Sequence, residues 1–167
     1  MRRIAAITRN PAAVALVAML AVAGCASKQT PNNPADLGLG AGAGGAPGSS
    51  QDFTVNVGDR IFFDTDSSVI RADAQTTLAR QAQWLGQYPN YAITVEGHAD
   101  ERGTREYNLA LGARRAAAAR DFLVARGVQS NRIRTISYGK ERPVAVCDNI
   151  SCWSQNRRAV TVLSGGS

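Results

Sequence analysis

The chain has 167 residues, of which 44% are hydrophobic and 19% are charged, and its formal net charge is +6. This length allows one ordinary domain with a short appendage, and the composition excludes a fully disordered chain and a protein with many membrane spans. Removing Arg2, Arg3 and Arg9, which precede an apolar run, lowers the net charge to +3. The basic balance therefore belongs partly to an export signal, and we expect no nucleic-acid partner.

The N-terminus has the pattern of an export signal. Residues 12–23 are twelve small or apolar residues, which is too short for a membrane span of about 20 residues but suits a signal peptide. Val22-Ala23-Gly24-Cys25 resembles the bacterial lipobox, so we expect residues 1–24 to be removed and Cys25 to be lipidated. The alternative is an ordinary signal peptide with a chance cysteine. Ala26, in place of aspartate, favours sorting to the outer membrane of a Gram-negative bacterium.

Residues 25–51 are expected to form the lipidated N-terminus and a flexible linker. The segment holds six of the 16 glycines and three prolines, and it contains too little apolar surface to offset the entropy of ordering. Its 26 residues after the cysteine, fully stretched, reach roughly 86–94 Å. We therefore expect residues 52–163 to fold as a domain in the periplasm, held to the membrane by lipid, with residues 164–167 as a disordered tail.

Periodicity predicts strands and helices in alternation through residues 52–163. In chain order we expect a strand at 53–57, a Gly58-Asp59 turn, a strand at 60–63, a helix at 72–87, a strand at 91–96, a polar loop at 97–103, a helix at 105–126, a strand at 132–138, and a last strand at 159–163 after the cysteine loop. This order favours an α/β (α+β) two-layer sandwich with a mixed sheet and one helical layer.

Cys147 and Cys152 lie five residues apart in the exported part of the chain. A disulfide is favoured because exported compartments are oxidising. A metal-binding pair is the competing interpretation, but it lacks partners, since His98 is the only histidine and zinc sites need about four ligands. We expect no metal and no other cofactor.

Polar residues cluster after the third predicted strand, where open sheets usually bind ligands. On the helix that follows, Asn108, Leu111 and Arg115 share one face. A buried arginine needs an anionic partner, and Asp100, on the loop before the helix, is a candidate neighbour. The pair has two interpretations: an internal salt bridge, or a clamp in which Arg115 binds a carboxylate and Asp100 an ammonium.

Several separated motifs resemble the OmpA-like peptidoglycan-binding domain family. They are Gly97-His98-Ala99-Asp100-Glu101-Arg102-Gly103-Thr104, Tyr107-Asn108, Leu111-Gly112-x-x-Arg115-Ala116, Phe62-Phe63-Asp64, Tyr138-Gly139-Lys140-Glu141-x-Pro143 and Gln155-Asn156-Arg157-Arg158-Ala159-Val160. With the lipobox and the linker, the whole chain is similar to lipoprotein members of this family. The resemblance implies that the domain binds the diaminopimelate of peptidoglycan stem peptides and so tethers the outer membrane to the cell wall.

The resemblance also implies which residues hold the ligand. Asp100 matches the family's ammonium-binding aspartate and Arg115 its carboxylate-binding arginine. Asn108 would shape the pocket, Phe63 and Asp64 would line it from the end of a strand, and Arg102 and Leu111 match further pocket positions. His98 is expected to be structural. Gly112 departs from the serine that is common in the family.

A glycan hydrolase, a protein-binding module and a flagellar-stator domain are the alternative functions. Asp100 and Glu101 could in principle be paired carboxylates of a glycan hydrolase, but adjacent loop positions usually point in different directions, so we expect no catalysis. The resemblance implies TolB and the other Tol-system proteins, which act in cell division and outer-membrane integrity, as partners. A flagellar-stator domain would need a transmembrane helix in place of the lipobox. Arg157 and Arg158 are expected to be a solvated helix end, with a glycan or partner contact as the alternative.

Overall fold

The computed structural model describes residues 45–165. The expected signal peptide, Cys25 and most of the linker lie outside these residues. The strands are β1 (Arg60–Phe62), β2 (Ala92–His98), β3 (Ile133–Gly139) and β4 (Arg158–Ser164). The helices are α2 (Ser50–Asp52), the π-helix η2 (Phe53–Gly58), α3 (Ala72–Gln87), α4 (Arg105–Ala125), the 3₁₀ helix η3 (Ser130–Arg132) and α5 (Ile150–Asn156).

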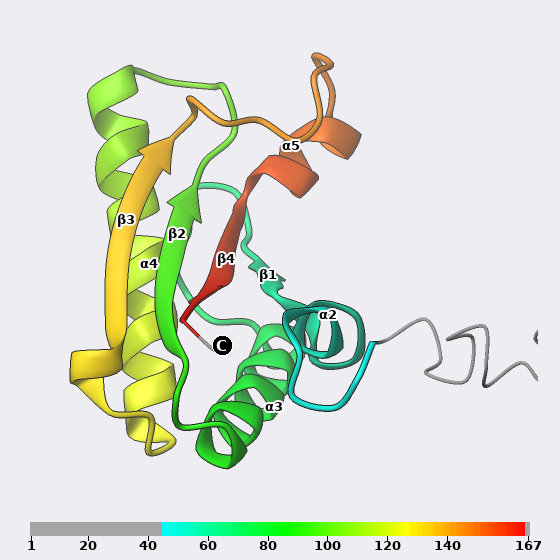
Figure 1. The fold of residues 1–167 in the computed structure, drawn as a ribbon. Coiled ribbons are helices and arrows are strands. Elements are labelled where there is room, and N and C mark those ends of the chain that lie inside the picture. Colours follow the sequence, from blue (N-terminus) through cyan, green and yellow to red (C-terminus); the bar gives the residue numbers. More distant parts are fainter. Residues whose placement is uncertain (1–44, 166–167) are drawn as a thin grey trace, which may run out of the picture. The chain divides into compact units, whose positions relative to one another are not determined.

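The four strands form one mixed sheet in the order β1-β4-β2-β3. β2 and β3 are parallel, and β4 is antiparallel to both β1 and β2. Parallel neighbours need a crossover connection, and α4 supplies it: this helix packs on β2 and β3 (Figure 1). α3 packs beside α4 and against β1. The predicted two-layer α+β architecture is confirmed.

An apolar stripe on the first long helix faces the core. Leu78, Ala82 and Leu85 are all buried on α3, and α3 has the predicted bounds. On α4, Leu111, Ala119 and Leu123 are buried, and the partly buried Phe122 packs against the same core. Gly127 follows α4 at φ +95°, a conformation that ends helices and that glycine adopts without strain.

A close approach between β2 and α4 depends on two glycines. A Cβ atom placed on Gly97 would lie 1.8 Å from the carbonyl oxygen of Gly112. A Cβ atom on Gly112 would lie 2.4 Å from the hydroxyl of Ser137. The position of Gly112 therefore has no room for a side chain unless its neighbours move. The contact sets how deeply the first turns of α4 sit against the sheet.

The strand predicted at residues 53–57 is wrong, because this segment is helical. Its start is fixed by Ser49, whose hydroxyl accepts a hydrogen bond from the amide of Asp52. Phe53 is buried, and its ring centroid lies 4.9 Å from that of Trp84. Packing against α3 therefore overrides the β preference of Phe, Thr and Val, as tertiary contacts often do.

The folded domain includes residues before the expected boundary at Asp52. The hydroxyl of Tyr91 donates to the carbonyl of Gly48, and the indole of Trp84 donates to the Asp52 carboxylate. These contacts hold residues 48–52 against α3 and the start of β2. At the other end, β4 includes Ser164, which had been expected in the tail. Within residues 45–165, no helix combines the length and the apolar composition that a membrane crossing requires.

Candidate functional site

A cavity of about 220 Å³ lies beyond the carboxyl end of β2, where the 99–104 loop meets the start of α4. Five of its lining residues were predicted from the sequence: Asp100, Arg102, Asn108, Leu111 and Arg115. Thr65, Asp66, Gly103 and Tyr107 also line it and were not predicted. The loop after β1 thus supplies one wall, and the loop and helix after β2 supply the other.

Arg115 is the most deeply buried charge of the site. Its side chain is fully buried, and its guanidinium donates to the carbonyl of Ser67 at 2.8 Å, of His98 at 2.8 Å and of Asp64 at 3.0 Å. These carbonyls offset the cost of burying the charge. A guanidinium has five N–H donors, so two are left after these three bonds, and Arg115 lines the cavity.

The acceptors of Arg115 differ from the expected one. We expected Asp100 as its anionic neighbour, but no salt bridge joins the two side chains within the described part of the chain. Desolvation lowers the pKa of Arg115 to about 10, against which the nearby charge of Asp100 acts. Arg115 therefore stays protonated at neutral pH while part of its hydrogen-bonding capacity is unused.

Asp100 faces the same cavity and already holds four donors. Its Oδ1 accepts from the backbone amide and the Nε of Arg102, both at 3.3 Å. Its Oδ2 accepts from Nη2 of Arg102 at 2.8 Å and from Nη1 of Arg157 at 3.3 Å. Burial alone would raise the pKa of Asp100, but the hydrogen bonds from Arg102 and Arg157 outweigh it and hold the pKa below its ordinary value. Asp100 is thus ionised at neutral pH.

Arg157 was missed as part of the site. It had been expected at a solvated helix end together with Arg158, yet both are buried. Its Nε donates to the carbonyl of Phe63, while its Nη1 reaches Asp100. The pairing of β1 with β4 brings residues 94 positions apart into contact, and no local pattern reveals this register. A buried carboxylate that needs a cation was the only sequence signal available.

Phe63 and Asp64 support the site from behind and do not line the cavity. The Phe63 ring is buried, and the guanidinium carbon of Arg115 lies 5.2 Å from its centroid. Asp64 contributes its backbone carbonyl to Arg115, whereas its carboxylate is exposed and pairs with Arg71 at 3.2 Å. The expectation that this pair lines the pocket therefore differs from the arrangement found.

Three residues of α4 shape the walls. The amide of Asn108 donates to the carbonyl of Arg102 at 2.7 Å, which fixes the 100–103 loop to the helix. Leu111 gives an apolar wall and is itself buried. The hydroxyl of Tyr107 donates to the carboxylate of Asp66, across the cavity mouth from the other loop. Tyr107 lay in a family-like motif, but its partner became evident only from the fold.

His98 does not line the cavity. Its ring is buried with its centroid 5.5 Å from that of Tyr138. Desolvation, helped by the charges of Arg158 and Arg142, lowers the pKa of His98 to about 4, so the ring is neutral at physiological pH. What His98 contributes to the site is its backbone carbonyl, which accepts from Arg115.

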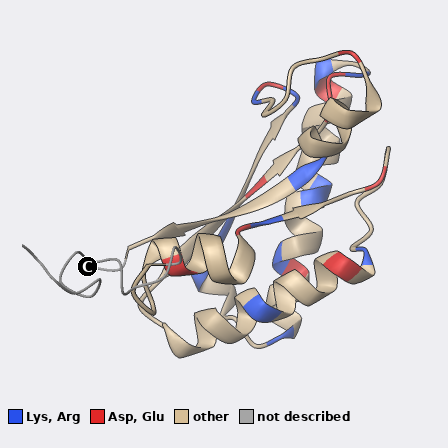
Figure 2. Cartoon of the chain, turned by 90° about the vertical axis from the view of Figure 1, so that its right-hand side faces the viewer, with Lys and Arg blue, Asp and Glu red and all other residues tan. Residues whose placement is uncertain are grey.

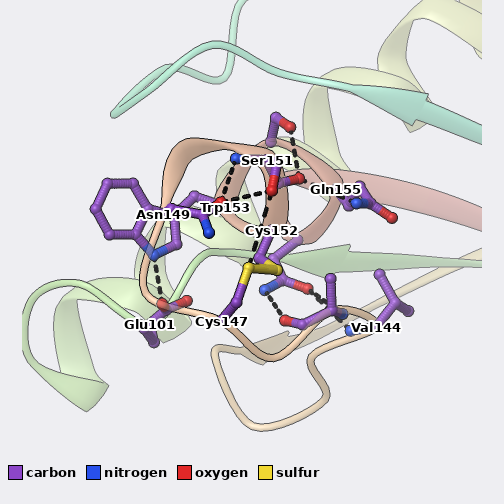
Figure 3. Close-up of a disulfide and its surroundings, with 11 residues drawn as sticks. Glu101, Val144, Cys147, Asn149, Ser151, Cys152, Trp153 and Gln155 are labelled. Carbon is purple, nitrogen blue, oxygen red and sulfur yellow. Dashed lines mark hydrogen bonds between the residues drawn. A yellow bond between two sulfur atoms is a disulfide. The ribbon is translucent and has the colours of Figure 1, made fainter.

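Beside the cavity, Cys147 and Cys152 are joined in a disulfide with their Cα atoms 5.7 Å apart (Figure 3). The side chain of Asn149 caps α5, which contains Cys152. The next residue, Trp153, donates its indole N–H to the carboxylate of Glu101 on the cavity loop. Residues 45–165 hold no group of His, Cys, Asp or Glu side chains that could bind a metal ion.

Acidic and basic residues lie side by side at the end of the molecule where α4 begins (Figure 2). This mixture suits a ligand that carries both charges. The buried guanidinium of Arg115 and the ionised carboxylate of Asp100 line the same small cavity. Chemically it can bind a zwitterion, with one contact for a carboxylate and one for an ammonium.

Comparisons with known proteins show which family the chain resembles. The model of the OmpA family matches residues 62–157. A relative from Mesorhizobium japonicum named peptidoglycan-associated lipoprotein is 82% identical over 165 residues, which covers 99% of this chain and 98% of the relative.

Two solved structures share the fold. The crystal structure of the peptidoglycan-associated lipoprotein from Burkholderia pseudomallei is 42% identical with a TM-score of 0.62, and the match covers 64% of this chain and 90% of that one. The C-terminal domain of Helicobacter pylori MotB is 26% identical with a TM-score of 0.61 over 65% of this chain and 86% of that one. These relatives are structural proteins rather than enzymes, in agreement with the expectation of a non-catalytic domain. The chain therefore belongs to the OmpA family and, within it, groups with the peptidoglycan-associated lipoproteins.

Proposed function

We propose that this chain is a non-catalytic tether between the outer membrane and peptidoglycan. Lipid on Cys25 would hold the outer membrane, and the domain would bind the cell wall from the periplasmic side. The names of its relatives, which give both a lipoprotein and an association with peptidoglycan, support the proposal. The similarity to the Mesorhizobium relative over almost the whole chain favours this function over a flagellar-stator role suggested by the MotB fold.

The ligand we propose is the side chain of diaminopimelate in a peptide stem that is not crosslinked. Arg115 would bind its carboxylate through the two unused N–H donors, and Asp100 would bind its ammonium. The observation that carries the proposal is that a fully buried guanidinium and a buried, ionised carboxylate line one cavity of about 220 Å³. Diaminopimelate has the extra ammonium and carboxylate that these two groups select.

The remaining predicted residues would act around this pair. Asn108 and Leu111 would shape the walls, while Phe63 and the carbonyl of Asp64 would hold Arg115 in place. Arg102 would act next to Asp100, to whose carboxylate it already donates a hydrogen bond.

Titration with two synthetic stem peptides tests the proposal. The full-length chain in detergent should bind a diaminopimelate-containing stem and bind the lysine-containing stem much more weakly, because lysine lacks the carboxylate that Arg115 would take. Asp100→Ala should abolish pull-down by sacculi while circular dichroism stays native-like. Equal affinity for the two stems would remove Arg115 from the mechanism, and parent-like binding by Asp100→Ala would remove Asp100.

We also propose, from the family resemblance, that the domain takes part in the Tol system during cell division and binds TolB. A direct binding assay tests this proposal. Purified TolB should bind the full-length chain, and soluble diaminopimelate stem peptide should reduce that binding if the two surfaces overlap.

A further inference from the structure

The hydrogen-bond acceptor positions of the Asp100 carboxylate are occupied by donors of the protein itself. A carboxylate offers about four lone-pair positions, and Asp100 accepts four hydrogen bonds, three from Arg102 and one from Arg157. An incoming ammonium would need a position on these oxygens. At least one donor present in the structure must therefore leave before a ligand can bind there.

The two arginines that donate to Asp100 differ in how firmly the rest of the protein holds their side chains. The side chain of Arg157 is 8% exposed and is also held by the carbonyl of Phe63. The side chain of Arg102 is 42% exposed and, besides Asp100, contacts an aromatic ring. Moving Arg157 would disturb the buried strand pair behind the site, whereas moving Arg102 would disturb only a surface side chain.

A second support for Arg102 lies beside the cavity. Its guanidinium carbon lies 4.2 Å from the centroid of the Trp153 ring, a favourable cation–π distance. Trp153 is fixed by its hydrogen bond to Glu101 and stands next to Cys152, which is tied to Cys147 (Figure 3). The guanidinium can thus release the carboxylate and keep its contact with this braced ring.

We propose that Arg102 is a displaceable internal cation that occupies Asp100 until a ligand ammonium replaces it. The proposal rests on the function proposed above and adds a specificity-determining residue to that site. An exchange of one cation for another at Asp100 yields little net free energy, because an attraction of similar kind is lost and gained. An amine alone would therefore bind weakly, and tight binding would require the second contact, between a carboxylate and Arg115.

The test compares Arg102→Met with Arg105→Met in the full-length chain. Methionine can pack its thioether on the Trp153 ring but cannot compete for Asp100. Arg105 is a matched control, since it lies three residues away, pairs with Glu141 and does not line the cavity. Arg102→Met should bind the diaminopimelate stem about fivefold more tightly than the parent, the size expected for releasing a partly exposed ion pair. Arg105→Met should bind like the parent.

A ligand without the ammonium separates displacement from other effects. A stem peptide with 2-aminopimelate in place of diaminopimelate keeps the side-chain carboxylate and lacks the ammonium. The gain from Arg102→Met should vanish with this peptide. In the parent, diaminopimelate stem should shift the indole N–H resonance of Trp153 and leave that of Trp84, which lies in the core on Asp52, in place.

The outcomes are distinct. Weaker binding of the diaminopimelate stem by Arg102→Met would show that Arg102 contacts the ligand directly and would overturn displacement while leaving the proposed function intact. An unchanged affinity together with a fixed Trp153 resonance would overturn it too. Failure of the parent to bind the diaminopimelate stem at all would instead reject the proposed function, and displacement with it.

Discussion

The two ends of the cavity hold their charges in opposite ways. At one end Arg115 is fully buried and bound by three backbone carbonyls. At the other end Asp100 is held by side chains, one of which, Arg102, is partly exposed. A charge fixed by the main chain keeps its geometry whether or not a ligand is present. A charge satisfied by a surface side chain can exchange that partner. The site thus combines a rigid contact with an exchangeable one.

The largest expected effect comes from the rigid end. Gly97→Ala would place a Cβ atom against the carbonyl of Gly112, where α4, which carries Arg115, packs closely on β2. Because backbone would have to move, we expect the free energy of unfolding to fall by about 3 kcal/mol. Urea denaturation measures it. Gly86→Ala is the control, since a Cβ there meets nothing within 4 Å, and it should stabilise the protein by about 0.5–1 kcal/mol.

Substitutions of Arg115 and Arg102 compare the two charged groups through their effects on the free energy of unfolding. Arg115→Met leaves three carbonyls without their donor in a buried place, so we expect a loss of about 2–3 kcal/mol. Arg102→Met breaks a pair that is partly exposed and should cost less than about 1 kcal/mol. Thermal and urea denaturation of both variants measure the difference. Equal losses would mean that the two ends are held alike.

We expect the disulfide to stabilise only the region beside Arg102 and Asp100. Replacing Cys147 and Cys152 together with serine removes a short loop closure that is worth at most about 2 kcal/mol. The loss should fall on residues 147–153, and hydrogen exchange of the amides in β2 and the first turns of α4 should stay unchanged. Faster hydrogen exchange of the β2 amides would show that the disulfide also stabilises the region around Arg115.

The smallest effect is confined to acid. The pKa of Asp100 lies below its ordinary value of 3.8 in the folded protein, so its ion pairs add stability above that value and lose it as pH falls through the folded pKa. Unfolding midpoints measured from pH 6 downward should therefore drop more steeply in the parent than in Asp100→Asn. Parallel curves would mean that Asp100 has the same pKa folded and unfolded.

The parts of the structure that the sequence predicts are those with strong local patterns. The helix at residues 72–87 follows from its apolar spacing, and Asp100 and Arg115 follow from a polar cluster placed between a strand and a helix. Both line the cavity. Their roles toward a ligand stay predictions, as do lipidation of Cys25 and the linker that follows it.

The parts that local patterns could not predict depend on contacts between distant segments. The segment at 53–57 has the composition of a strand and becomes helical because Phe53 packs on Trp84. Arg157 belongs to the site only through the β1–β4 register. The Tyr107–Asp66 hydrogen bond spans 41 positions. In each case a tertiary neighbour decides the outcome.

The attachment of residues 48–52 near the start of β2 has a mechanical consequence. These residues are held by Tyr91 and Trp84, whereas the cavity lies beyond the opposite end of the same strand. In a tether of the proposed kind, a pull between the membrane and the wall would run along the sheet. Ladder hydrogen bonds lie across the strands, so the load would be shared by many bonds at once instead of opening them one by one. Placing the attachment of residues 48–52 and the cavity near opposite ends of β2 therefore suits a domain that must hold under tension.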